Sequence, residues 1–276
     1  MPGSFGRIGN GARARRSFAL AVLLAVTPAC RDVPAGESPN RDPPEPVIEQ
    51  DRAGEGRTEG SSATDEAREV LVRSLGRRGI ADQRVLDAMR RVPRHRFIPR
   101  SHRGHAYEDR ALPIERGQTI SQPYIVAYMT EMARVEAGEK VLEVGTGSGY
   151  QAAVLAEMGV DVYSIEIIEE LSRGAAGVLG ELGLDRVHLR VGDGYAGWPE
   201  HAPFDAVIVT AAAPHIPTSL VEQLARGGRL VIPVDGAASL QWIWLVERDE
   251  DGRITRKRTI PVRFVDMTGR VREPAE

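Results

Sequence analysis

The chain has 276 residues, of which 42% are hydrophobic and 27% are charged, and its formal net charge at pH 7 is −3. This composition is typical of a globular protein and excludes a chain that is disordered throughout. The near balance of charges excludes a basic field over the whole surface, as a nucleic-acid-binding protein would have. The single cysteine, Cys30, excludes an intrachain disulfide and a zinc site built from cysteines.

Residues 1–30 have the layout of a secretory signal. Four arginines without an acid precede nine apolar residues, 18–26, which are too few to cross a bilayer as a helix. The stretch 15–18 resembles a twin-arginine signal, and Cys30 stands where a lipoprotein is cut and acylated, although residues 27–29 lack the usual leucine. The alternative is a non-functional extension from an upstream start codon.

Residues 31–63 are predicted to form a disordered tether rich in proline, glycine and charge. The segment has five prolines and few bulky apolar residues, so it cannot bury enough surface to offset its conformational entropy. A single domain is then expected over 64–276, with Thr64 as the N-cap of its first helix. A second helix is expected over 82–91, ending before Pro93.

Strands and helices alternate through the middle of the chain, which predicts an α/β fold of the Rossmann-like, doubly wound kind. Two further strands, at 240–246 and 254–265, alternate in polarity and are expected to be antiparallel. The result is a mostly parallel seven-stranded sheet with helices on both faces. The other expected strands are 140–144, 161–165, 186–191, 204–210 and 228–232, and the expected helices are 123–132, 150–158, 168–182 and 217–225.

A glycine turn follows the first of these strands, and the spacing of its glycines is G-x-G-x-G. Dinucleotide enzymes have G-x-G-x-x-G instead, and Glu143 just before the turn disfavours a phosphate and suits a cationic ligand such as S-adenosylmethionine. Glu166 ends the next strand and is suited to ribose hydroxyls, while Asp193 ends the third, where adenine would lie. A glycine turn alone is also a plain strand–helix connection, but the three features together predict an S-adenosylmethionine site. The predicted cofactor-binding residues are Glu143, Gly145, Thr146, Gly147, Ser148, Glu166, Gly192, Asp193 and Gly194.

Several segments between about residues 68 and 270 also share a family pattern, and the run 117–123, Gly-Gln-Thr-Ile-Ser-Gln-Pro, is the most distinctive. With these segments the chain resembles the protein-L-isoaspartate O-methyltransferase family. It departs from the pattern at Glu115 and Arg116, where a pair containing glycine is usual, and at Asp266, where proline is usual. The first departure is expected to alter the peptide groove and the second to be a surface change. The other segments are 96–99, 106–109, 111–114, 141–155, 163–166, 192–194, 203–213, 227–233 and 262–269.

The resemblance implies a repair reaction that transfers a methyl group from S-adenosylmethionine to the free α-carboxylate of L-isoaspartyl residues in damaged proteins and peptides. Such a carboxylate has a pKa of about 4 and is already ionised near pH 7, so neither a general base nor a metal is required. We expect a monomer that binds isoaspartyl proteins and no nucleic acid. The family and the methyl-donor supply imply a cytoplasmic enzyme; the leader implies export, or membrane anchoring through Cys30.

By the same resemblance, Ser121 is the catalytic residue, because a neutral hydroxyl can orient one oxygen of the acceptor carboxylate. The alternative reading makes Ser121 the N-cap of the helix over 123–132. Two other functions stay open: a methyltransferase acting on a small molecule, and a non-catalytic lipoprotein that binds ligands with the same fold.

Two further groups of residues are expected to be structural. His95, His102 and His105 lie among arginines in an expected surface loop; the alternatives are a metal site or a basic rim for acidic peptides. Trp242 and Trp244 share one face of a strand and are expected to pack in the core or at an interface.

Overall fold

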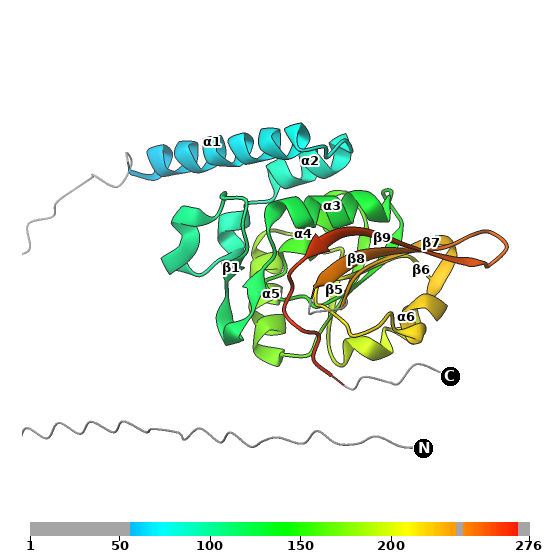
Figure 1. The fold of residues 1–276 in the computed structure, drawn as a ribbon. Coiled ribbons are helices and arrows are strands. Elements are labelled where there is room, and N and C mark those ends of the chain that lie inside the picture. Colours follow the sequence, from blue (N-terminus) through cyan, green and yellow to red (C-terminus); the bar gives the residue numbers. More distant parts are fainter. Residues whose placement is uncertain (1–55, 236–239, 270–276) are drawn as a thin grey trace, which may run out of the picture. The chain divides into compact units, whose positions relative to one another are not determined.

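The computed structural model describes residues 56–235 and 240–269, which lie within one compact unit, Asp51–Glu276 (Figure 1). The predicted leader, 1–30, and most of the predicted tether fall outside the described residues. Helix α1 (Gly56–Arg77) begins at Gly56, so Thr64 lies inside the helix and is not its N-cap. The last proline before α1 is Pro46, so no proline interrupts the helix between Gly56 and Thr64.

The α1 helix packs on α2 (Gln83–Arg91), which in turn contacts α3 (Pro123–Ala133) and α4 (Tyr150–Glu157). The start of α2 is fixed by Asp82, whose Oδ1 accepts a hydrogen bond of 2.9 Å from the amide of Arg84. The segment after α2, expected as a loop, contains two 3₁₀ helices, η1 (Arg94–Phe97) and η2 (Arg100–His105). Each begins directly after a proline, whose fixed φ suits the residue that precedes a helix.

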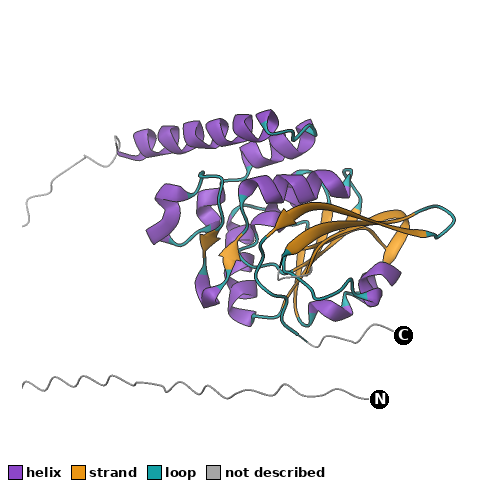
Figure 2. Ribbon diagram, in the orientation of Figure 1, coloured by secondary structure: helices purple, strands orange, loops and turns teal. Residues whose placement is uncertain are grey.

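The main sheet has the strand order β5-β4-β3-β6-β7-β8-β9, and helices flank it (Figure 2). Strands β3 to β7 are parallel to one another, whereas β8 is antiparallel to both β7 and β9, as predicted. The chain builds outward from β3 through β4 to β5 and then restarts on its other side at β6, so β3 and β6 flank the switch point where ligands bind in such folds. The bounds are β3 (Lys140–Val144), β4 (Asp161–Glu166), β5 (Val187–Val191), β6 (Phe204–Val209), β7 (Leu224–Asp235), β8 (Gln241–Arg248) and β9 (Ile254–Val262).

Two buried clusters sandwich the sheet because successive strand residues point to opposite faces. On one face, Val141 and Ile208 pack with apolar side chains of α3 and α4. On the other face, Leu142 and Val207 pack with Leu220 of α6 (Thr218–Glu222). Helix α5 (Glu169–Glu181) packs beside α4. The remaining elements are the hairpin β1 (Leu112–Pro113) and β2 (Thr119–Ile120) and the 3₁₀ helices η3 (Glu115–Gly117), η4 (Gly194–Ala196) and η5 (Pro199–His201).

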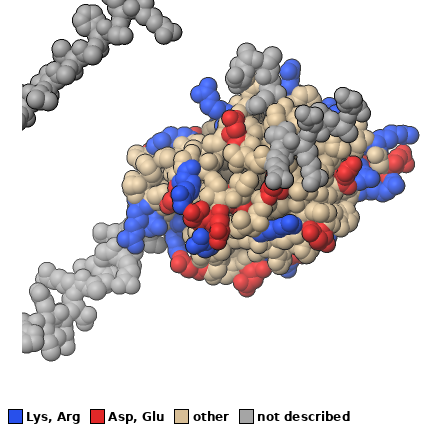
Figure 3. Space-filling model, turned by 90° about the horizontal axis from the view of Figure 1, so that it is seen from below, with Lys and Arg blue, Asp and Glu red and all other residues tan. Residues whose placement is uncertain are grey.

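Trp242 and Trp244, predicted to pack in the core or at an interface, lie on β8 at the antiparallel end of the sheet, and each is half-buried. Trp244 packs against the second cluster, whereas the Trp242 ring lies 4.5 Å from the guanidinium carbon of Arg258. On the face seen in Figure 3, acidic and basic side chains are interspersed. Among the described helices, none combines the length and the apolar character that a membrane crossing requires.

Candidate active site

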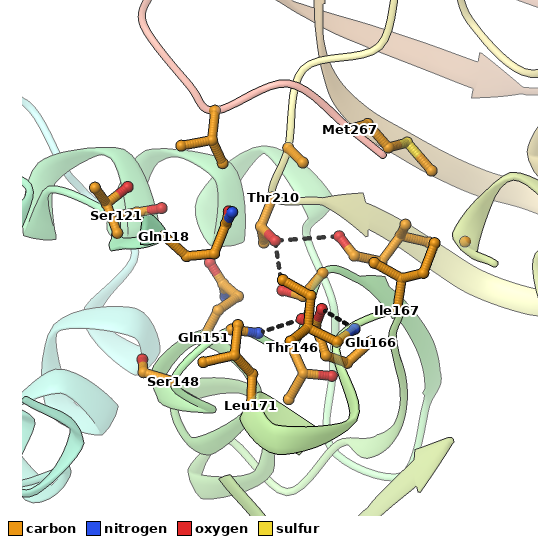
Figure 4. A pocket seen from close by; sticks show the side chains of 18 of the residues that line it. Gln118, Ser121, Thr146, Ser148, Gln151, Glu166, Ile167, Leu171, Thr210 and Met267 are labelled. Carbon is orange, nitrogen blue, oxygen red and sulfur yellow. Dashed lines mark hydrogen bonds between the residues drawn. The ribbon is translucent and has the colours of Figure 1, made fainter. Parts of the chain in front are cut away.

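A cavity lies at the carboxyl ends of β3, β4 and β6, which is the switch point of the sheet (Figure 4). It encloses about 790 Å³, including the part that is open to solvent. Seven of the ten predicted site residues line it: Ser121, Gly145, Thr146, Gly147, Ser148, Glu166 and Gly194. Glu143, Gly192 and Asp193 do not.

The glycine turn forms one wall of the cavity, and its backbone requires glycine. Gly145 has φ of 97°, and a Cβ on it would lie 2.4 Å from the hydroxyl oxygen of Thr210. That hydroxyl donates to the carbonyl of Gly145 at 2.5 Å, so the end of β6 holds the turn from behind. Gly147 has φ of 53° and donates its amide to Glu166 Oε2 at 2.8 Å. The turn therefore presents bare backbone to a ligand.

Glu166 is the buried carboxylate at the end of β4, and only 6% of its surface is exposed. Its second oxygen, Oε1, accepts a hydrogen bond of 2.9 Å from the amide of Ile168. Each carboxylate oxygen has a further lone pair, so two backbone amides fix the group while leaving it able to accept hydroxyls from the cavity side.

Glu143 lies beneath the turn and does not line the cavity, so its predicted role toward a cationic ligand stays a prediction. Its Oε2 accepts a short hydrogen bond from Ser164, whose hydroxyl also contacts that of Thr146 at 2.6 Å. Its other oxygen, Oε1, is buried without a partner. Burial, with a smaller effect of the charge on Glu166, raises the pKa of Glu143 to about 8. The carboxyl group is therefore mainly neutral at pH 7.

The segment 192–194 reaches the cavity through Gly194 alone, where a Cβ would lie 2.3 Å from Val144 Cγ1. Gly192 donates its amide to the carbonyl of Glu166 at 2.9 Å. Asp193 caps η4 by accepting the amide of Tyr195 at 3.0 Å. Gly192 and Asp193 thus shape the end of β5 next to the cavity without lining it.

Ser121 lies across the cavity from Glu166 and Ile167 (Figure 4). It also lines a second, adjoining cavity of about 1050 Å³, open to solvent, between residues 109–111 and 261–264; we call this second cavity the outer groove. The N-cap of α3 is Gln122, without a side-chain capping bond, so the alternative role of Ser121 as N-cap is wrong. The side-chain hydroxyl of Ser121 makes no hydrogen bond to any described residue.

Comparison with known proteins identifies the family. Residues 66–272 match the family model described as Protein-L-isoaspartate(D-aspartate) O-methyltransferase (PCMT). The chain belongs to the protein-L-isoaspartate O-methyltransferase family. It is 58% identical over 188 residues to protein-L-isoaspartate O-methyltransferase 2 of Syntrophobacter fumaroxidans, covering 68% of this chain and 76% of the relative. It is 57% identical over 205 residues to the enzyme of Opitutus terrae, covering 74% and 88%.

Solved structures of the family have the same fold. One protein-L-isoaspartate O-methyltransferase superposes with a TM-score of 0.68 and 30% identity, over 73% of this chain and 66% of that one. A second, from Plasmodium falciparum in complex with S-adenosyl-L-homocysteine, gives a TM-score of 0.64 and 26% identity, over 73% and 98%. The chain is thus an S-adenosylmethionine-dependent repair methyltransferase with the predicted fold.

The cavity fits this methyl donor. At Gly145 and Gly194 the neighbouring side chains of Thr210 and Val144 leave no room for a Cβ, so bare backbone borders the cavity at both positions. Glu166 is the one carboxylate in the cavity that is anchored by backbone amides, and a ribose hydroxyl pair is the ligand such an acid suits.

Sequence reasoning missed the apolar part of the wall, formed by Ile167, Ile168 and Leu171 after β4. It also missed Thr210 and Ala211, although they directly follow the carboxyl end of β6, where ligands of such folds bind. The C-terminal residues 265–268 complete the wall. Among them, Asp266 is exposed as predicted, but it stands on the rim of the cavity.

Glu115 and Arg116, the other departure from the family pattern, border a third cavity. The lining residues Gly147 and Ser148 are common to this cavity and the first. Arg116 has a left-handed backbone, with φ of 58°, and pairs with Glu170 of α5. The departure therefore lies beside the glycine turn, and these two residues do not line the outer groove; an effect on peptide binding stays a prediction.

The histidines near η1 and η2 make separate local contacts. His95 Nδ1 lies 2.8 Å from the hydroxyl of Tyr107, and His105 Nδ1 lies 2.6 Å from Glu108 Oε1. In the described part of the chain, no three His, Cys, Asp or Glu side chains are grouped so that they could hold a metal ion.

Proposed function

We propose that Ser121 orients the α-carboxylate of an isoaspartyl residue for methylation. The observation that carries the proposal is that Ser121 lines both the first cavity, which fits the methyl donor and which we call the cofactor cavity, and the outer groove. A carboxylate that enters from the groove meets this hydroxyl before it reaches the space beside Glu166. The hydroxyl donates to one carboxylate oxygen and leaves the other free to react.

S-adenosylmethionine, when bound, supplies a methyl group on a positively charged sulfur and leaves as a neutral thioether. The chain's own contribution is placement and the exclusion of water. Ile167, Ile168 and Leu171 give the cavity an apolar wall on the Glu166 side, which helps to exclude water from the space where the methyl donor binds. No residue has to remove a proton, because the acceptor is already a carboxylate at neutral pH.

For substrate, we propose that the isoaspartyl peptide lies along the outer groove. Its walls combine Ile125 and Phe264 with Arg263, an exposed cation that forms no ion pair with any described residue. An extended peptide can place apolar side chains on Ile125 and Phe264 and an acidic side chain near Arg263.

A Ser121→Ala variant tests the role of the hydroxyl. Loss of one orienting hydrogen bond is expected to lower kcat about 10- to 100-fold, while the dissociation constant of S-adenosylmethionine stays the same. Ser101→Ala, an exposed serine in η2, is the matched control. Unchanged turnover in Ser121→Ala would remove Ser121 from the mechanism.

For cellular context, we propose a monomeric domain that begins with α1 and acts in the cytoplasm, where the methyl donor is made. The alternative is a leader, 1–30, that exports the protein or anchors it through Cys30, with 31–55 as the tether because α1 begins at Gly56. Fractionation of cells expressing the full chain and Cys30→Ser distinguishes the two. The cytoplasmic proposal predicts a soluble pool with an uncleaved leader in both; membrane-bound protein released by Cys30→Ser contradicts it.

A further inference from the structure

Arg94, the first residue of η1, is completely buried and forms no ion pair with a carboxylate of the described residues. Its Nε donates to the carbonyl of Ala106 at 3.0 Å and its Nη2 to the carbonyl of Ser121 at 2.8 Å. The third nitrogen, Nη1, has no hydrogen-bond partner in the described part of the chain. The guanidinium carbon lies 4.7 Å from the centre of the Tyr150 ring, within the range of a cation–π contact.

A buried charge without a counter-ion is unfavourable for folding, and an apolar side chain of similar volume fills such a space at lower cost. Burial lowers the pKa of Arg94 to about 10, so the side chain is still charged at neutral pH. The contacts of Arg94 show what the charge does: it joins two parts of the chain that both line the first cavity, where the methyl donor is expected to bind.

One of these parts is the loop that carries Ser121. Arg94 holds the carbonyl of Ser121 itself, and Ala106 begins the segment that clamps the residues after it. In that segment, Asp109 accepts the side-chain amide of Gln122 at 3.1 Å and the backbone amide of Tyr124 at 2.8 Å.

The other part is the cofactor side. Tyr150 lines the cavity and is the first residue of α4, directly after the glycine turn. Tyr150 as a whole is 2% exposed, and its ring packs edge-on against Phe97 and forms the surface on which the guanidinium lies. A planar guanidinium can hold two carbonyls at fixed directions and rest on a ring at the same time, which a single ammonium cannot do.

We propose that Arg94 is a positioning residue, which sets the distance between Ser121 and the bound methyl donor by tying the Ser121 loop to the start of α4. The inference rests on the proposed role of Ser121. A shift of about 1 Å in a reacting group is enough to cost about 100-fold in rate, so the loop requires a rigid support.

Arg94→Lys and Arg94→Met test this inference. Lysine keeps the positive charge but loses the planar guanidinium that donates to two carbonyls. Methionine keeps only the apolar part of the side chain. In the folded fraction of each variant, kcat is expected to fall 10- to 100-fold, while the dissociation constant of S-adenosylmethionine and the KM of the peptide change less than about threefold. Lysine is expected to retain more activity than methionine.

Arg248 provides a matched control. It lies in β8, its Nη1 donates to the carbonyl of Leu224 at 2.8 Å, and its Nε is buried without a partner. It lines none of the three cavities described above. Arg248→Lys is expected to lower the melting temperature without changing kcat. If Arg94→Lys behaves in the same way, the role of Arg94 is only structural and the inference is overturned.

A double-mutant cycle with Ser121→Ala separates the inference from the proposed function. If Arg94 acts through Ser121, Arg94→Lys lowers kcat much less in the Ser121→Ala background than in the wild type. Equal losses in both backgrounds overturn the inference alone. A Ser121→Ala variant with wild-type kcat overturns the proposed role of Ser121 instead.

Discussion

Glu143, the buried acid beneath the glycine turn, makes the stability of the protein depend on pH, and the substitution Glu143→Gln measures its contribution. Glu143 has a pKa of about 8 in the folded protein, against 4.5 for an ordinary glutamate. Because the folded pKa is raised, the folded state keeps a proton that the unfolded state loses. The contribution of Glu143 to stability is therefore complete below about pH 4.5 and is lost as the pH rises through 8.

The size of the effect follows from the two pKa values. Each pH unit between them lowers the free energy of unfolding by about 1.4 kcal/mol, which amounts to about 3 to 4 kcal/mol between pH 5 and pH 8. Glu143→Gln keeps the shape of the side chain and cannot ionise. The variant should therefore gain stability relative to the wild type by that amount over the same range, and the difference should level off above pH 8.

Urea unfolding followed by circular dichroism, at half-unit steps from pH 5 to pH 9, measures the difference. Glu222→Gln, an exposed glutamate in α6, is the control and should run parallel to the wild type. Parallel curves for Glu143→Gln and the wild type would refute the reasoning, because they would mean that Glu143 is ionised in the folded protein at neutral pH.

Three further outcomes follow from the geometry. Gly145→Ala places a Cβ 2.4 Å from the hydroxyl oxygen of Thr210 on a left-handed backbone, so calorimetry should show at least a tenfold loss of affinity for S-adenosylmethionine. Arg116→Gly relieves a left-handed arginine and removes only an exposed ion pair with Glu170, so urea unfolding should show a gain of about 0.5 to 1 kcal/mol in stability; a loss would mean that the ion pair dominates. Asp266→Asn removes a negative charge from the rim of the cavity, so the KM of peptides with an acidic residue beside the isoaspartate should fall, whereas that of neutral peptides should not; equal changes for both peptides would exclude a charge effect.

The regular elements of the sheet could be predicted because their signals are local. Lys140–Val144 and Phe204–Val209 are short apolar runs bounded by polar or glycine residues, and the structure has strands at both. The glycine turn and Glu166 were predictable for a similar reason, since each directly follows such a strand. The start of α1 at Gly56 was not, because residues 56–63 have no apolar periodicity that would indicate a helix.

The parts of the site that the sequence did not reveal depend on contacts between distant segments. Glu143 precedes the turn in the chain, yet its side chain turns to Ser164 of β4 instead of the cavity. Arg94 reaches the carbonyl of Ser121 across 27 residues, and backbone carbonyls have no sequence signature. The apolar wall at Ile167, Ile168 and Leu171 reads in the sequence as an ordinary strand–helix junction.

The measurement that most directly tests isoaspartyl methylation uses the purified full chain, labelled S-adenosylmethionine and two peptides that differ only in an isoaspartyl or a normal aspartyl linkage. Mass spectrometry of the product locates the methyl ester. The predicted result is a methyl ester on the free α-carboxylate of the isoaspartyl peptide and none on its twin. Equal labelling of the two peptides, or labelling of side-chain carboxylates in both, would contradict isoaspartyl specificity.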